Sequence, residues 1–485
     1  MLQKTSPYMR QAILIDGQWV QADSGATIDV INPASGLKLG TVPKAGKAET
    51  RRAIEAADAA FQTWKKTSVV ERHKLLRKLH DAIMDNQQTL AELLTMEQGK
   101  SLAESKGEVA ISAAYVLWFA EEGRRAYGDV VPSPWADRRI LVTKEPTGVV
   151  AAITPWNFPS SMLARKIGPA LAAGCTVVVK PASQTPYSGL AWGALAEEVG
   201  FPKGVVNVVT GSAAEIGDEL CSNPLVKKIT FTGSTEVGKV LIQKSASTVK
   251  KVSMELGGNA PFLVFDDADI KRAVEGAMVA KYRNSGQTCV CTNRFFVQAG
   301  VYDEFVAKLA EASQNLKVGS GLDDGTQQGP LIDEKAVEKV EELVADAKTK
   351  GARVMTGGKR HALGGSFYEP TVIADATPKM RFMKEEIFGP VAPVFRFTTE
   401  EEAIKLANDT EYGLACYFYT SDLGRAFRVM EGLKYGMVGV NEGLITTVEA
   451  PFGGVKESGL GREGGHQGIE DYLDTKYVCI GGLGV

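Results

Sequence analysis

The stretch TGVVAAITPWN, residues 147–157, opens the part of the chain whose pattern decides the fold. It is a short, valine-rich apolar run that ends in polar residues. Three similar runs follow it: CTVVVKPAS (175–183), GVVNVVTG (204–211) and KKITFTGS (227–234). Segments with helical composition lie between them, around 159–173, 186–200 and 212–221. Short buried strands that alternate with helices predict a parallel, doubly wound α/β sheet.

Polar residues follow these predicted strands directly. Asn157 comes after the first run, Lys180 ends the second, and Gly233 and Ser234 follow the fourth. Ligands of such sheets bind at the carboxyl ends of the strands, and a helix N-terminus there can bind a pyrophosphate. The pattern is not GxGxxG, so the glycine alone is a weak signal. Asn157 can donate a hydrogen bond to an oxyanion or can simply cap the next helix.

The rest of the chain predicts further elements. Before the sheet we expect helices at 47–66, 68–97 and 100–126, and an exposed strand at 137–146. After MELGGNAP (254–261) a second α/β unit begins, with helices near 269–283, 301–315, 333–350, 399–408 and 421–432. The chain ends in a glycine-rich tail and an edge strand at 471–480.

Composition excludes several classes of function. The 485 residues carry a net charge of −3, so no nucleic-acid partner is indicated. The most apolar runs are far shorter than a bilayer span, and the N-terminus MLQKTSPYMR lacks the core of a signal peptide. We therefore expect a cytoplasmic protein without membrane contacts. The six cysteines are too few for a disulfide framework, and the four histidines do not cluster, so we expect no metal site.

Cys289 and Cys291 lie in the polar stretch NSGQTCVCTNR, residues 284–294. Such a loop can hold a thiol at a cleft, where a neighbouring base or a lowered pKa activates it. A cysteine hydrolase needs a histidine base, and the four histidines are distant in sequence, although folding can bring one close. The alternative is a loop cysteine without function. Cys291 is a candidate redox partner that forms a reversible disulfide with Cys289, or else a packed cysteine.

Glu255 precedes Gly257 and Gly258 at the end of an apolar run. The glycines allow the backbone to turn sharply or to approach a ligand closely. A carboxylate at this point can act as a general base for water, or it can be an ordinary acidic residue at the end of a strand.

Seven motifs occur in one order: PWNFP, KPAS, FTGSTEVG, MELGGNAP, GQTC, EEIFGP and PFGGVKESGLGREGG. In this order and spacing the chain resembles the aldehyde dehydrogenase superfamily, from INPASG at residues 31–36 to its end. The resemblance implies an α/β fold with a Rossmann-like cofactor domain, an α/β catalytic domain and a small β oligomerisation element.

The resemblance also implies roles for individual residues. Cys289 is the nucleophile, Asn157 and the backbone N–H of Cys289 stabilise the oxyanion, and Glu255 activates the water that hydrolyses a thioester. Cofactor contacts are implied for Trp156, Lys180, Ser183, Gly233, Ser234 and Glu386. Relatives that prefer NAD often have a glutamate where this chain has Ser183. A serine beside Lys180 accepts a 2′-phosphate, so we expect NADP to be preferred and NAD to be usable.

Within the superfamily the chain is most similar to the enzymes that oxidise succinate semialdehyde to succinate, the last step of 4-aminobutyrate breakdown. Arg165 and Arg283 match the positions that hold the substrate carboxylate there, and Thr446 replaces a serine hydroxyl. An arginine fork suits a buried carboxylate. Another carboxylated aldehyde such as glutarate semialdehyde is an alternative, because one methylene discriminates by only about 1–3 kcal/mol. A cysteine hydrolase or a non-catalytic relative is the alternative from another class.

The expected domain boundaries follow the change of pattern and the resemblance. The cofactor domain uses 1–126 and 147–257, and the catalytic domain uses 258–457. The oligomerisation element combines 127–146 with 458–485. The exposed strand and the resemblance together imply a homotetramer built from dimers.

Overall fold

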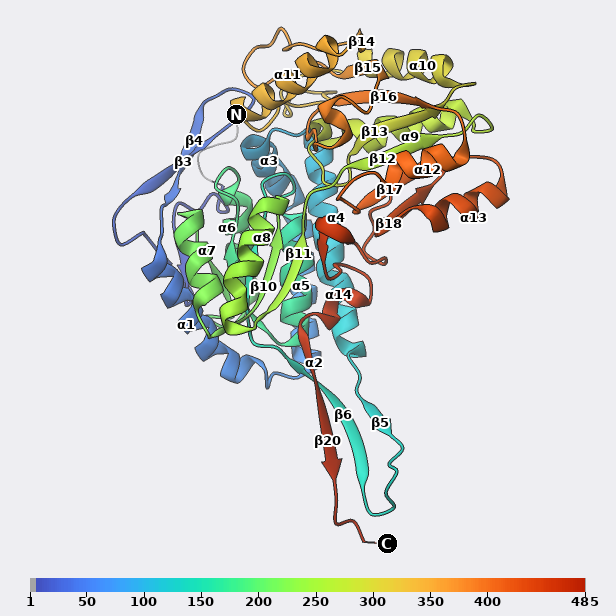
Figure 1. The fold of residues 1–485 in the computed structure, drawn as a ribbon. Coiled ribbons are helices and arrows are strands. Elements are labelled where there is room, and N and C mark those ends of the chain that lie inside the picture. The colour runs from blue at the N-terminus through green and yellow to red at the C-terminus, as the bar shows by residue number, and fades with distance from the viewer. Residues whose placement is uncertain (1–5, 485) are drawn as a thin grey trace.

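The computed structural model describes residues 6–484 and contains the predicted parallel sheet (Figure 1). This first sheet has eight strands in the order β19-β11-β10-β7-β8-β9-β1-β2. Its five parallel strands are β7 (Val149–Ile153), β8 (Thr176–Lys180), β9 (Val206–Val208), β10 (Val226–Thr232) and β11 (Lys251–Glu255). All four predicted valine-rich runs are confirmed as strands. Every residue of β7 and β8 is buried, which explains why these strands are continuously apolar.

Four helices connect these strands. The three predicted ones are confirmed as α5 (Ser161–Ala173), α6 (Pro186–Val199) and α7 (Ala213–Ser222), and α8 (Thr235–Ser245) follows β10. Each helix follows the carboxyl end of a strand, so the strand ends and the helix N-termini share one edge of the sheet. All 13 residues of α5 are buried. This helix therefore forms part of the core that carries the site.

The helices before the sheet are α1 (Lys47–Trp64), α2 (Val69–Asp85), α3 (Gln87–Gln98) and α4 (Leu102–Glu122). The prediction of one helix over 68–97 is wrong, because the chain breaks at Asn86 into α2 and α3. The Asn86 side chain donates to the carbonyl oxygen of Ala82 at 2.9 Å. Asparagine competes in this way for backbone groups and favours helix ends.

The second sheet takes seven strands from residues 260–440 in the order β14-β15-β16-β13-β12-β17-β18. These strands are β12 (Ala260–Val264), β13 (Thr292–Gln298), β14 (Arg353–Thr356), β15 (Thr371–Ala376), β16 (Val391–Phe397), β17 (Ala415–Tyr419) and β18 (Met437–Val440). The accompanying helices are α9 (Ile270–Tyr282), α10 (Tyr302–Gln314), α11 (Glu334–Thr349), α12 (Glu400–Asn408) and α13 (Leu423–Gly432). The second α/β unit is therefore confirmed.

A three-stranded arm projects from the body and carries the C-terminus at its far end (Figure 1). It consists of β5 (Asp129–Val131), β6 (Arg139–Pro146) and β20 (Leu473–Ile480), in the order β20-β6-β5. The two predicted outlying strands are confirmed, and they pair antiparallel with each other over eight residues. Where the functional domains begin and end stays a prediction.

The remaining elements are short. They are β1 (Ile13–Ile15), β2 (Gln18–Val20), β3 (Thr27–Ile31), β4 (Lys38–Pro43), β19 (Gly459–Leu460) and α14 (Gln467–Glu470). β3 and β4 pair with each other, and β19 joins the edge of the first sheet beside β11. Within residues 6–484, no helix combines the length and the apolar character that crossing a bilayer requires.

Candidate active site

Cys289 lies in the turn between the short helix η3 (Arg283–Gly286) and β13. The backbone φ is positive at three consecutive residues, 51° at Asn284, 57° at Ser285 and 74° at Gly286. Left-handed backbone is tolerated best by glycine and asparagine. At Gly286 a Cβ atom would lie 2.2 Å from the carbonyl oxygen of Gly389, so only glycine fits. The turn is strained, as backbones near functional groups often are.

Cys289 lines two pockets and therefore stands between them. The sheet pocket, of about 360 Å³, lies at the carboxyl edge of the first sheet and includes Trp156, Asn157, Gly233, Ser234, Glu386 and Phe388. The helix pocket, of about 290 Å³, lies against α4 and α5 and includes Glu104, Phe158, Met162, Arg283, Leu444 and Thr446. One thiol is thus open to two ligands from different sides.

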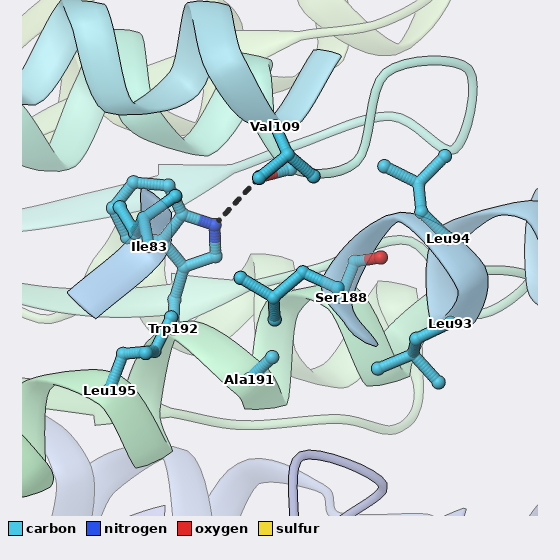
Figure 2. A pocket seen from close by; sticks show the side chains of 10 residues that line it. Ile83, Leu93, Leu94, Val109, Ser188, Ala191, Trp192 and Leu195 are labelled. Carbon is cyan, nitrogen blue, oxygen red and sulfur yellow. Dashed lines mark hydrogen bonds between the residues drawn. The ribbon is translucent and has the colours of Figure 1, made fainter. Parts of the chain in front are cut away.

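A third cavity is a packing void. It lies between α2, α3, α4 and α6 and is lined mainly by apolar side chains, including Ile83, Leu93, Val109 and Trp192 (Figure 2). Its volume of about 10 Å³ is at the lower limit for one water molecule. The Trp192 indole N–H donates to Ser160 Oγ at 3.2 Å, directly before α5. The closely packed helices around this void thus contact the start of α5 through the Trp192–Ser160 hydrogen bond.

Four predicted cofactor residues meet in the sheet pocket: Trp156, Gly233, Ser234 and Glu386. Ser234 is the N-cap of α8, so a helix N-terminus faces the pocket. Glu386 accepts a hydrogen bond from the Gly258 N–H at 3.1 Å, and burial raises its pKa to about 7. The pocket therefore offers backbone donors for a phosphate and a carboxylate for hydroxyl groups.

Lys180 and Ser183 lie outside the lining of this pocket, at the end of β8 and just beyond it. Lys180 is only 7% exposed, and burial lowers its pKa to about 8. Within residues 6–484 no charged neighbour offsets this shift. A buried ammonium without a counter-charge fits an external anionic or hydroxyl ligand, because burying an isolated charge is costly.

The helix pocket contains two of the three predicted substrate residues, Arg283 and Thr446. The Arg283 guanidinium lies 5.6 Å from the centre of the Phe158 ring. No carboxylate of residues 6–484 lies within 4.0 Å of this guanidinium. Its five N–H donors are therefore available to an anion that enters the pocket.

Arg165, the third predicted substrate residue, does not line the pocket. Its guanidinium packs 4.1 Å from the centre of the Phe452 ring and 3.9 Å from a Glu463 oxygen. Two of its nitrogens, Nε and Nη1, have no hydrogen-bond partner among the described residues. Arg165 thus lies behind the Phe452 side chain, which itself faces the pocket.

Asn157 is buried beside the Cys289 turn. Its amide nitrogen donates to the carbonyl oxygen of Gln287 at 3.0 Å. A carboxamide nitrogen carries two protons, so one remains for a second acceptor. This hydrogen bond orients the Asn157 amide, because it ties the side chain, which follows β7, to the turn that carries Cys289.

Glu255 ends β11 and is 3% exposed. Burial is the main cause that raises the pKa of its carboxyl group well above the usual range, and Glu463 adds to the rise. Lys166 and Arg165 act in the opposite direction. Its Oε2 has no hydrogen-bond partner within the described chain. Glu255 does not line either pocket, although its charge is felt by the Cys289 thiol.

Burial raises the pKa of the Cys289 thiol to about 12. Arg165 and Arg283 lower it, while Glu255 and Glu386 raise it further. The thiol is therefore protonated at neutral pH in the free protein. A cation or a hydrogen-bond donor that reaches the sulfur lowers this barrier.

Cys291 is 3% exposed and points away from both pockets. Its thiol donates to the carbonyl oxygen of Lys281 at 3.3 Å. Neither Cys289 nor Cys291 forms a disulfide here. The redox switch between the two thiols stays a hypothesis.

The model of the aldehyde dehydrogenase family matches residues 19–478. The chain belongs to this family. It is 60% identical over 480 residues to a glutarate-semialdehyde dehydrogenase of Pseudomonas aeruginosa, and 59% identical to a 3-sulfolactaldehyde dehydrogenase of Pseudomonas putida. Each comparison covers at least 99% of both chains.

An NADP(+) succinate-semialdehyde dehydrogenase of Escherichia coli is 59% identical to this aldehyde dehydrogenase, with 98% of this chain and 99% of the relative covered. The crystal structure of a succinate-semialdehyde dehydrogenase from Burkholderia pseudomallei has a TM-score of 0.98 and 59% identity. That comparison covers 99% of this chain and 100% of the other. The predicted family and fold class are thereby confirmed.

Several polar residues of the site were not predicted from the sequence of this aldehyde dehydrogenase. Gln98, Lys100, Glu104 and Glu108 contact the chain around Asn157 and Asn284. Polar residues at helical spacing are usually interpreted as the solvent-exposed face of an amphipathic helix. No local sequence pattern indicates that these four contact the site. The only available signal was the density of charge in EQGKSLAESKGE, residues 97–108.

The raised pKa of Cys289 predicts how fast the free enzyme reacts with iodoacetamide. Only the thiolate reacts, so the alkylation rate at Cys289 should rise about tenfold per pH unit from pH 7 to pH 9.5. Peptide mass spectrometry separates this site from the exposed Cys479. Glutathione is the control and should level off above about pH 8.5. A rate at Cys289 that levels off below pH 8 would contradict the burial argument.

Proposed function

We propose that this aldehyde dehydrogenase oxidises succinate semialdehyde to succinate and prefers NADP as the acceptor. The observation that carries the proposal is the unpaired guanidinium of Arg283 in a pocket that ends at the Cys289 thiol. A guanidinium without an ion-pair partner among residues 6–484 at one end and a nucleophile at the other suit a short aldehyde with an anion at its far end.

The names of the relatives support this class of substrate. Glutarate semialdehyde and succinate semialdehyde carry a carboxylate, and 3-sulfolactaldehyde carries a sulfonate. All three are aldehydes with a second, anionic group. Glutarate semialdehyde is the second candidate substrate, because this chain is 60% identical to a glutarate-semialdehyde dehydrogenase.

In the proposed reaction the Cys289 thiol releases its proton to solvent as the sulfur adds to the aldehyde carbon, and a thiohemiacetal anion forms. The free N–H of the Asn157 amide and the backbone N–H of Cys289 stabilise the oxygen that becomes negative. The bound nicotinamide supplies the acceptor for the hydride that leaves the same carbon. The thiohemiacetal thereby becomes a thioester on Cys289.

Glu255 is proposed to complete the reaction. Its raised pKa makes the ionised carboxylate a stronger base than an exposed glutamate, so it can take a proton from the water that attacks the thioester. The acid is released and the Cys289 thiol is restored. Lys166 forms an ion pair with Glu463. Its positive charge lowers the pKa of the Glu255 carboxyl and so favours the ionised base.

For the cofactor we propose that Gly233 and Ser234 hold the pyrophosphate and that Glu386 holds the nicotinamide ribose. Lys180 and Ser183 are proposed to meet the adenosine ribose. A carboxylate at position 183 would repel a 2′-phosphate, whereas a serine hydroxyl accepts it beside the buried ammonium. This supports NADP, with NAD as a usable alternative.

We also propose a homotetramer built from dimers. The arm exposes large apolar side chains that a monomer has little reason to expose: Tyr127, Val130 and Tyr477 are 73%, 78% and 60% exposed. Both edges of the arm sheet are also unpaired within the part of the chain that the structure describes, which favours pairing with another copy.

Arg283→Ala tests the substrate. Loss of a charged hydrogen-bond donor costs about 1.5–3 kcal/mol, so kcat/KM for succinate semialdehyde should fall about 10- to 100-fold. Butyraldehyde, which has no carboxylate, should change by less than about threefold. Arg272→Ala on the exposed face of α9 is the matched control and should leave both substrates unchanged. Equal losses on the two aldehydes would count against a carboxylate site at Arg283.

Ser183→Glu tests the choice of cofactor. The new carboxylate should lower kcat/KM for NADP, while NAD gains a partner for its 2′-hydroxyl. The ratio of the two should fall at least about tenfold, which is about 1.4 kcal/mol. Gln184→Glu adds the same charge one residue further on and should leave the ratio within about twofold. An unchanged preference in Ser183→Glu would exclude this role for position 183.

A further inference from the structure

One backbone oxygen beside the thiol, the carbonyl oxygen of Asn157, accepts hydrogen bonds from two buried side chains. Lys100 Nζ donates at 2.7 Å and Asn284 Nδ2 donates at 2.9 Å. Both donors are only 1% exposed, and they come from separate parts of the chain. The reaction proposed above uses neither of them.

The Asn284 amide spans the two parts of the proposed oxyanion site. Its Nδ2 donates to Asn157 on one side and to the carbonyl oxygen of Gln287 on the other, at 3.2 Å. The Asn157 amide donates to the same Gln287 oxygen. Asn284 thus fixes the separation between the peptide that orients Asn157 and the turn that carries the Cys289 N–H.

The last residue of α3 and the first turn of α4 hold Asn284 in this pose. Gln98 donates to Asn284 Oδ1 at 2.9 Å, and Glu104 accepts from the Asn284 backbone N–H at 2.7 Å. These contacts stabilise a residue whose φ is 51°. Asparagine tolerates the left-handed region better than most residues do, so the backbone also favours asparagine or glycine here.

Lys100 links the same carbonyl to the start of α5. Its ammonium pairs with Glu108 at 2.6 Å, and the other Glu108 oxygen accepts from the backbone N–H groups of Ser160 and Ser161. The ammonium also lies 3.7 Å from the centre of the Phe158 ring. A buried charge pair of this kind is costly unless every group is satisfied, and here each one has a partner.

We propose that Lys100 and Asn284 are positioning residues that aim the free N–H of the Asn157 side chain at the aldehyde oxygen. This inference rests on the proposed function. Because both residues hold the backbone of Asn157, they act on the reaction only through its side chain. Their removal should misdirect the Asn157 amide and leave the thiol itself intact.

Asn284→Gly removes the amide and keeps a residue that accepts the left-handed backbone. We expect kcat to fall about 10- to 100-fold, with KM for the aldehyde and Kd for the cofactor within about threefold. Alkylation of Cys289 by iodoacetamide in the cofactor-free protein should stay within about twofold of the wild-type rate. Lys100→Met provides a second, independent variant with the same expected pattern. A change in the alkylation rate as large as the change in kcat, in either direction, would show that the thiol itself has moved and would overturn the proposal.

A double-mutant cycle with Asn157→Ala gives the decisive comparison. Loss of one oxyanion donor costs about 100- to 1,000-fold in kcat. Because Asn284 acts through the Asn157 side chain, Asn157→Ala with Asn284→Gly should be no more than about threefold slower than Asn157→Ala alone. Losses that multiply would overturn the proposal.

Thr95→Val is the matched control for a merely structural role. It removes a buried hydrogen bond to Ser105 between α3 and α4 and touches neither Asn157 nor Asn284, so kcat should stay within about twofold. If Thr95→Val lowers kcat as much as Asn284→Gly does, the positioning role is excluded. If the wild-type enzyme fails to reduce the cofactor with any aldehyde, the proposed function fails instead. If the wild-type enzyme is active and the losses of the two single variants multiply in the double variant, only the positioning role is disproved.

Discussion

The left-handed turn from Asn284 to Gly286 is the constraint on which the rest of the site depends. It carries the chain from the end of α9 to β13 and leaves Cys289 between the two sheets, where both pockets reach the thiol. Such a backbone persists only when its surroundings hold it. Gly389 leaves no room for a side chain at Gly286, and buried polar groups satisfy Asn284 on every side. Buried polar side chains from α3 and α4 are therefore used to stabilise this one turn.

Burial has a second consequence, because it makes the charged forms of the reactive groups costly until a ligand arrives. The pKa values of Cys289 and Glu255 are raised, and the pKa of Lys180 is lowered, in each case mainly by desolvation. A site in this state is poised for ligands that bring the missing charges. An anionic cofactor near Lys180 and an anionic substrate near Arg283 each supply a charge that the protein leaves unmatched within the described residues.

The sequence predicts the fold well where the signal is local. Valine-rich runs that are buried on both faces could be read directly, and the motifs around Cys289 and Glu255 indicated the family. The break at Asn86 was missed, because a side-chain hydrogen bond ends α2 without changing the helical spacing. The role of Arg165 in holding the substrate carboxylate was inferred from resemblance and stays a prediction, since its guanidinium contacts Phe452, which lines the pocket, and does not line the pocket itself. Lys100 and Glu104 were missed because only the packing of distant segments buries the charges of α4 and the loop before it.

Cys289 is proposed as the nucleophile in the oxidation of an aldehyde whose far end is held by the Arg283 guanidinium, with the nicotinamide as the oxidant. The most direct test is the initial rate of reduced-nicotinamide formation by the wild-type enzyme, with NADP and with NAD, on succinate semialdehyde, glutarate semialdehyde and butyraldehyde. We expect the highest kcat/KM for NADP with succinate semialdehyde and a steep fall for butyraldehyde. Similar values for all three aldehydes would preserve the chemistry at Cys289 and contradict the anion site at Arg283.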